Sequence, residues 1–373
     1  MKNKVALFIS LIAFAFLLFS CKKTKPVTGG SGSVSGDSIF VSLSRTVIEF
    51  NNFDFVTITV RDKNGNDITS GCSILLNSST AISSKYVPTA TGSYSIMARK
   101  NGCISDSKTL TVITKSSSPF TQKILLEDCT GAWCGYCPRL AYDISQYKLT
   151  HPNCISLAVH GGSSGTDPYK FQYYTTFNST FGITGYPTAV FNRKKQPDGT
   201  FEWSENTSDL DAALQEWAPL GLAINSSVSG SSVSGTVKIK FNVTTEKSMK
   251  VVIALVENGL VYPQTNYYSP QYGVTPYLYG GVSPINDFVH DGVLRRTATN
   301  LMGDPINVAQ QTKDNILEVP FTLSLSGSVY GGAAYNAVAN NCAIIAFVVD
   351  GSTANKGAYN VQYAPVGATV NFD

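Results

Sequence analysis

A Cys-x-x-Cys pair at a predicted junction between a strand and a helix is the feature that most constrains this chain. Cys134 and Cys137 lie within the segment WCGYCP at residues 133–138. The apolar run in residues 123–128 predicts a short buried strand, and the helical spacing of apolar side chains in residues 138–149 predicts a helix. Two cysteines at such a junction can cycle between a dithiol and a disulfide, so the segment indicates a chemistry as well as a fold.

The two cysteines are expected to have different roles. Cys134 would lie at the helix N-terminus, where unpaired backbone N–H groups and the positive end of the helix dipole favour a thiolate. We therefore interpret Cys134 as the exposed nucleophile and Cys137, one turn into the helix, as the shielded thiol that resolves a mixed disulfide. A zinc site is the alternative, but it needs two more ligands. The sequence has no second Cys-x-x-Cys pair and only three histidines to supply them. We expect no metal and no cofactor.

A second segment, FGITGYPTAVF at residues 181–191, follows in the order that a redox domain of this kind would need. Together the two segments resemble the thioredoxin superfamily. The resemblance implies that Pro187 has a cis peptide bond beside the redox pair and that Tyr186 faces the substrate backbone. Trp133, Gly135 and Tyr136 are the other substrate-contacting residues that it implies. The Gly-Tyr dipeptide between the cysteines is similar to that of periplasmic disulfide isomerases.

An acidic residue just before the pair is a candidate proton acceptor for the inner cysteine. The superfamily often has a buried acid near the position of Asp128, and Glu127 is its neighbour. Successive side chains of a strand point to opposite faces, so only one of the two can face the cysteines. We favour Asp128 and keep Glu127 as the alternative.

The N-terminus predicts export and anchoring. Residues 1–20 combine two early lysines with a short apolar run and end in LFS before Cys21, which resembles a bacterial lipoprotein cleavage box. Cys21 would then carry the lipid, and residues 21–37, rich in Gly and Ser, would form a flexible tether. No aspartate and no acidic tag follow Cys21. By resemblance to lipoprotein sorting rules, this suggests the outer membrane, on its periplasmic face.

The rest of the chain indicates β-rich modules on both sides of the redox segment. Alternating apolar residues and turn signals predict an Ig-like β-sandwich over residues 38–114, a thioredoxin-like domain over 115–219 and a β-sandwich over 220–373. In an oxidising envelope, Cys72 and Cys103 are predicted to form a structural disulfide, with two free thiols as the alternative. Only 14% of residues are charged and no basic run lies outside the tether, so nucleic acid is not an expected partner.

A long loop at residues 262–289 is rich in tyrosine and proline. Loops of this length are usually functional or disordered. The exposed tyrosines would hold a peptide or a glycan, or would pack over the edge of the sandwich, and the sequence leaves both options open. His290 and Arg295 follow the loop, and we interpret them as structural because no nucleophile accompanies them.

The order of these segments resembles a family of Bacteroidetes outer-membrane lipoproteins, the twenty-eight-kilodalton outer-membrane-protein family, from about residue 120 to the C-terminus. That family is named for location and size, so the resemblance supplies no substrate. Cys129 stands where an aromatic residue would be expected. Cys129, Cys154 and Cys342 are predicted to be buried free thiols.

Two functions from different classes fit these observations. The favoured one is a membrane-anchored thiol-disulfide oxidoreductase that acts on thiols or disulfides of envelope proteins and depends on a separate electron donor. The alternative is a binding, adhesion or assembly lipoprotein in which the thioredoxin-like domain is a scaffold and the cysteines form a permanent bridge. The direction of electron flow and the oligomeric state do not follow from the sequence.

Overall fold

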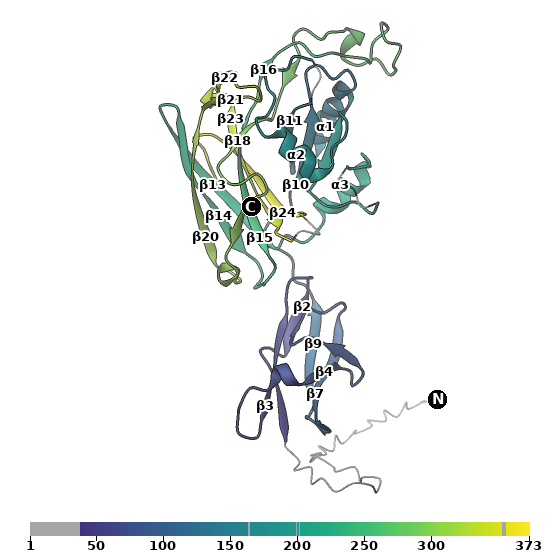
Figure 1. Cartoon of the computed structure of the whole chain (residues 1–373), viewed down its shortest axis with the longest axis vertical. Coiled ribbons are helices and arrows are strands. Elements are labelled where there is room, and N and C mark those ends of the chain that lie inside the picture. The colour runs from purple at the N-terminus through teal and green to yellow at the C-terminus, as the bar shows by residue number, and fades with distance from the viewer. Residues whose placement is uncertain (1–37, 163–164, 199, 201, 353–355) are drawn as a thin grey trace, which may run out of the picture. The chain divides into compact units, whose positions relative to one another are not determined.

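The computed structural model describes residues 38–373 except 163–164, 199, 201 and 353–355 (Figure 1). The chain forms two compact units, one ending at Lys115 and one covering Ser116–Asp373. Both consist mainly of β-sheet, which confirms the expected β-rich, multidomain organisation. The predicted signal peptide, the lipidated Cys21 and the tether lie outside the described residues. Within the described part of the chain, no helix is both long and apolar enough to cross a membrane.

The first unit is built from two sheets that share one apolar core. Side chains such as Ile58 and Val60 on one sheet and Ile96 and Leu110 on the other are fully buried between them, because each strand alternates apolar and polar residues. One sheet has the order β1 (Ile39–Leu43), β3 (Val56–Asp62) and β6 (Lys85–Tyr86). The other has the order β2 (Val47–Phe50), β9 (Lys108–Thr114), β7 (Gly92–Lys100), β4 (Ser73–Leu76) and β5 (Thr80–Ile82), with β8 (Cys103–Ile104) paired to β7.

The disulfide predicted between Cys72 and Cys103 is not present, because both thiols are free. Strand β7 separates them: Arg99 of β7 pairs with Ser73, the neighbour of Cys72, on one side and with Ile104, the neighbour of Cys103, on the other. Two strand spacings amount to about 9.6 Å, and a disulfide requires Cα atoms within about 7 Å. The thiol of Cys72 instead contacts the carbonyl oxygen of Ile68 at 3.2 Å.

In its described residues, the second unit contains an eight-stranded sheet, a four-stranded sheet, two short ribbons and three α-helices. Figure 1 shows how these elements are arranged. The large sheet has the order β12 (Thr188–Phe191), β10 (Ile124–Thr130), β11 (Cys154–His160), β18 (Val293–Thr297), β15 (Met249–Glu257), β23 (Cys342–Asp350) and β24 (Ala358–Pro365), with β19 (Asp304–Ile306) paired to β15. The four-stranded sheet has the order β20 (Ile316–Ser324), β14 (Ser232–Phe241), β13 (Leu220–Ser229) and β25 (Thr369–Val370). The ribbons are β16 (Leu260–Val261) with β17 (Val289–His290) and β21 (Ser326–Ser328) with β22 (Ala334–Asn336). The helices are α1 (Cys137–Thr150), α2 (Tyr174–Phe181) and α3 (Thr207–Leu214).

The large sheet continues across the expected domain boundary at residues 219 and 220. Strands β10 and β11 are parallel, and β12 is antiparallel to β10. β11 then pairs with β18 through Ala158 and Val293, and the N–H group of Ala158 donates to the carbonyl of Gly292 at 2.8 Å. Residues 116–373 therefore form one compact unit in which strands from both expected domains share a sheet.

Strand β10 is buried on both faces, and every one of its residues is buried. Its even positions, including Ile124 and Leu126, pack in a cluster with Leu140 of α1 and Leu210 of α3. Its odd positions, including Leu125, pack with α2 and with strands from the C-terminal part of the chain. The even face of β10 is therefore the face covered by the helix that carries Cys137.

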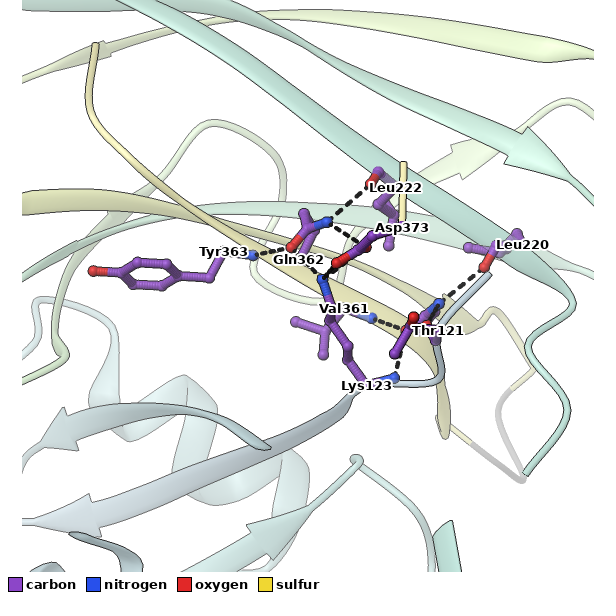
Figure 2. Close-up of polar contacts among 9 residues, drawn as sticks. Thr121, Lys123, Leu220, Leu222, Val361, Gln362, Tyr363 and Asp373 are labelled. Carbon is purple, nitrogen blue, oxygen red and sulfur yellow. Dashed lines mark hydrogen bonds and ion pairs between the residues drawn. The ribbon is translucent and has the colours of Figure 1, made fainter. Parts of the chain in front are cut away.

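Buried polar contacts fasten the start of β10 to the C-terminus (Figure 2). The Lys123 ammonium donates to Gln362 Oε1 at 2.8 Å and to a carboxylate oxygen of Asp373 at 2.6 Å, and the Thr121 N–H donates to the carbonyl of Asp373 at 2.6 Å. Gln362 in turn donates to the carbonyl of Leu222 in β13 at 3.2 Å. Because Lys123 is buried, these partners satisfy a charge that burial would otherwise penalise.

Candidate redox site

The disulfide joins Cys134, in the loop after β10, to Cys137 at the start of α1. Hydrogen bonds from Cys134 N to the Gly131 carbonyl (2.9 Å) and from Cys137 N to the Cys134 carbonyl (3.3 Å) tighten this loop. Pro138 fits the first turn of α1, where a helix has no acceptor for the N–H that proline lacks. Cys137 is the first residue of α1, and Cys134 lies just before it. We call residues 131–135 the disulfide loop.

Both cysteines are buried, with 3% of Cys134 and 1% of Cys137 exposed. The prediction of a shielded Cys137 agrees with this burial, but the prediction of an exposed Cys134 is wrong for the disulfide state. Gln264 and Tyr267, from the long loop after β16, lie against the disulfide loop and cover it. The sequence marked that loop by its length and its tyrosines but did not indicate where it packs.

Asp128 lies on the even face of β10 and lines the same cavity as Cys137. The cavity has a volume of about 310 Å³ and is also lined by His160, Gln264 and Tyr279. Asp128 Oδ1 is buried and has no hydrogen-bond partner among the residues that the structure describes. Burial, with a smaller contribution from the charge of Glu205, raises the pKa of Asp128 to about 7.

Glu127 points to the opposite face of β10 and has a different partner. Its carboxylate accepts hydrogen bonds from Arg193 Nη2 at 2.7 Å and Nε at 2.9 Å, and both side chains are buried. The Arg193 guanidinium also lies over the ring of Phe347 at 4.7 Å. Glu127 is thus half of a buried ion pair, and Asp128 is the acid on the side of the cysteines.

Trp133 and Tyr186 pack against each other, with ring centroids 5.8 Å apart. Trp133 Nε1 donates to the Gly161 carbonyl at 3.0 Å, and the Tyr186 hydroxyl accepts from Asn178 at 2.7 Å. A Cβ atom at Gly162, where φ is +86°, would lie 2.2 Å from the Trp133 ring, so this close packing requires glycine. The Tyr186–Pro187 peptide bond is cis. Tyr136 is 48% exposed next to the disulfide.

Asp167 supports the disulfide loop and was not identified from the sequence. Its Oδ2 accepts from the Ala132 N–H at 3.0 Å and contacts His160 Nδ1 at 2.8 Å. Burial alone would raise the pKa of Asp167, but His160 and the backbone amides outweigh it and lower the pKa. His290 faces His160 at 5.1 Å between ring centroids, and burial together with His160 lowers the pKa of His290 to about 4.

Arg295, the other residue interpreted as structural, lies 3.2 Å from Glu257 and over the ring of Tyr335. Cys129, Cys154 and Cys342 are buried and free. In the part of the chain that the structure describes, no three His, Cys, Asp or Glu side chains are grouped so that they could hold a metal ion.

A family model described as outer membrane protein Omp28 matches residues 174–370, more than half of the 373-residue chain. The chain belongs to the Omp28 family. Membership of this family places the protein in the cell envelope, at the outer membrane. The matched part of the Omp28-family protein includes Tyr186 and Pro187 and begins after the disulfide loop.

Solved structures that match this Omp28-family protein include two from Porphyromonas gingivalis. HBP35 of Porphyromonas gingivalis has a TM-score of 0.50 at 16% sequence identity, over 67% of this chain and 77% of that one, which shows a shared fold. A domain of the outer membrane lipoprotein Omp28 from Porphyromonas gingivalis matches 40% of this chain and 88% of its own, with 18% identity and a TM-score of 0.24. No curated protein sequence matches this chain.

Proposed function

We propose that this Omp28-family protein is a membrane-anchored thiol-disulfide oxidoreductase that acts on proteins of the cell envelope. The observation that carries the proposal is a buried carboxyl, Asp128, which lines the same cavity as Cys137 and whose Oδ1 has no hydrogen-bond partner among the described residues. A purely structural disulfide gains nothing from such a group, because burying a carboxylate without a partner costs free energy. A carboxyl whose pKa is about 7 is suited to exchange a proton with a thiol near neutral pH.

The local arrangement supports assigning residues 115–219 to the thioredoxin superfamily. The disulfide loop follows β10, which is parallel to β11, α1 begins at Cys137, and the segment with Tyr186 and Pro187 leads into β12. Pro187 and Tyr186 would present the substrate backbone, and Trp133, Gly135 and Tyr136 would complete the contact surface.

The proposed reaction is a reversible two-electron exchange. In the reduced protein, the Cys134 thiolate attacks one sulfur of a substrate disulfide, and the substrate thiolate that leaves takes up a proton. Cys137 gives its proton to Asp128, and its thiolate attacks Cys134 Sγ in the mixed disulfide. The intramolecular disulfide forms, and the second substrate thiolate leaves with the proton from Asp128. A dithiol reductant of the envelope restores the reduced protein by the reverse sequence.

The alternative, a binding, adhesion or assembly lipoprotein with a permanent bridge, is favoured by one observation. Both sulfur-bearing residues are almost fully buried, and substrates reach an exchanging disulfide through an accessible sulfur.

The reduction potential of the Cys134–Cys137 pair separates these two functions. We expect equilibration with thiol redox buffers to give a value above roughly −300 mV, the range of disulfides that exchange. A value well below this would identify a structural bridge and favour the binding function. Mass spectrometry of the alkylated peptide that contains both cysteines measures the reduced fraction at each buffer ratio.

The anchor is a separate proposal, because Cys21 lies outside the described residues. We expect the wild-type protein to incorporate labelled palmitate and to fractionate with membranes, and Cys21→Ser to lose both properties, because lipidation requires the thiol. Labelling that persists in the variant would refute the lipoprotein assignment. Protection from external protease in intact cells, with digestion after permeabilisation, is expected for the periplasmic face.

A further inference from the structure

The long loop between β16 and β17 is an ordered segment whose ends are held together. Leu260 and Val261 pair with His290 and Val289 at its base, and Gln264 pairs with Ile285. We call residues 262–288 the tyrosine strap. In Figure 1 it is the green segment that begins at β16.

The strap pairs with the disulfide loop through its backbone. The N–H groups of Thr265 and Tyr267 donate to the carbonyls of Ala132 and Gly135 at 2.9 and 2.8 Å. Donors two residues apart lie on one edge of an extended segment, and here they pair with two carbonyls of the disulfide loop. The strap therefore occupies backbone acceptors that would otherwise be available next to Cys134.

Side chains of the strap close the remaining space over the disulfide. Gln264 Nε2 donates to the Cys134 carbonyl at 2.8 Å and to the Gly131 carbonyl at 3.2 Å. The Tyr267 ring lies directly on Gly135, so closely that a Cβ atom at residue 135 would be 2.4 Å from it. Tyr136 meets the Tyr267 ring edge to face, with centroids 5.0 Å apart.

The strap keeps its shape through its own contacts. Asn266 is fully buried, and its amide donates to the carbonyls of Leu278 at 3.1 Å and Val282 at 2.9 Å. By contrast, Tyr272 and Tyr277 are about half exposed, at 46% and 52%. Because the contacts of Asn266 lie within the strap, the strap can leave the disulfide loop without losing them.

We propose that the tyrosine strap is a built-in cover for the Cys134–Cys137 disulfide. It occupies the row of carbonyls that an extended polypeptide partner would pair with, and the partner must displace it before sulfur exchange. This inference rests on the proposed redox function. It adds a partner class, an extended chain with free N–H groups, and a control step that precedes the chemistry.

The test is the rate at which dithiothreitol reduces the Cys134–Cys137 disulfide in the full-length protein. Gln264→Ala/Tyr267→Ala removes the side-chain contacts of the strap, and Gly135→Ala forces the Tyr267 ring away by a different route. Each is expected to raise the rate at least about tenfold, because the reactive fraction is the fraction with the strap open. Tyr277→Ala, on the exposed part of the strap, is the matched control and is expected to stay within about twofold of wild type.

A second arm tests the partner class. A synthetic peptide of residues 262–270 is expected to slow reduction of the Gln264→Ala/Tyr267→Ala variant. The same peptide with proline at the positions of Thr265 and Tyr267 lacks both N–H donors and is expected to have no effect. Equal effects of the two peptides would overturn the backbone-pairing part of the proposal.

Equal reduction rates for wild type, the strap variant and Gly135→Ala would overturn the cover, and the redox function would stand if the reduction potential lies in the exchanging range. If dithiothreitol reduces the disulfide in none of the variants, both the cover and the redox function are overturned. Faster reduction in Gln264→Ala/Tyr267→Ala and in Gly135→Ala, but not in Tyr277→Ala, supports the cover.

Discussion

Replacing Cys137 by serine should make the protein accumulate covalent mixed disulfides with other envelope proteins. In the proposed reaction, Cys134 forms the bond to the substrate and Cys137 breaks it, so Cys137→Ser removes the group that releases the substrate. Cys134→Ser should trap almost nothing, because the proposed reaction assigns the first attack to Cys134, whereas Cys137, at the first position of α1, only resolves the mixed disulfide. We expect at least about tenfold more mixed disulfide in the first variant.

Non-reducing gels of cells treated with acid and an alkylating agent, followed by mass spectrometry, measure these adducts. The control is the variant that lacks both cysteines, which reports any capture by the buried thiols Cys129, Cys154 and Cys342. Equal adduct levels in Cys137→Ser and in this control would contradict the assignment of Cys134 as nucleophile and would favour the binding function.

Asp128→Asn should stabilise the oxidised protein at pH 8 by up to about 4 kcal/mol. Burial raises the pKa of Asp128 from 3.8 to about 7, so the native state holds a proton that the unfolded state has already lost in that interval. The stability from this group is therefore fully present below pH 4 and is lost as the pH rises to about 7. Three pKa units correspond to about 4 kcal/mol, and the variant has no such loss.

Urea unfolding of wild type and variant at pH 4 to 8 measures this difference, which should grow with pH and level off above pH 7. Glu127→Gln is the matched control on the same strand. It breaks the buried pair with Arg193, so it should destabilise the protein by about 3 to 5 kcal/mol. Parallel pH profiles for wild type and Asp128→Asn would show that Asp128 is hydrated or paired, and its role as proton acceptor would then have no physical basis.

Asp128→Asn should also slow the release of mixed disulfides, although it stabilises the protein. A protein made more stable by Asp128→Asn lacks the group that accepts the Cys137 proton, so stability gained at neutral pH would accompany slower release of mixed disulfides. A buried group that lowers stability and assists a reaction is a common property of functional sites.

The local sequence around the disulfide was sufficient to predict the strand and the helix that flank it. The apolar run that forms β10, the helical spacing in α1 and the Cys-x-x-Cys pair all act over a few residues, and the structure places the disulfide at their junction. Strand alternation also showed that only one of Glu127 and Asp128 could face the cysteines. It did not show which one, because that depends on the position of α1 and on Arg193, 66 residues from Glu127.

Only the tertiary structure decided how the site is covered and how its domain ends. Gln264 reaches the carbonyl of Cys134 across 130 residues of sequence, and no local pattern encodes that contact. The pairing of Ala158 with Val293 likewise joins strands from both sides of residue 219 into one sheet. The sequence is compatible with a bridge between Cys72 and Cys103, but β7 lies between them. Local propensity and periodicity act within one element, whereas burial, pairing and access depend on which distant segments pack together.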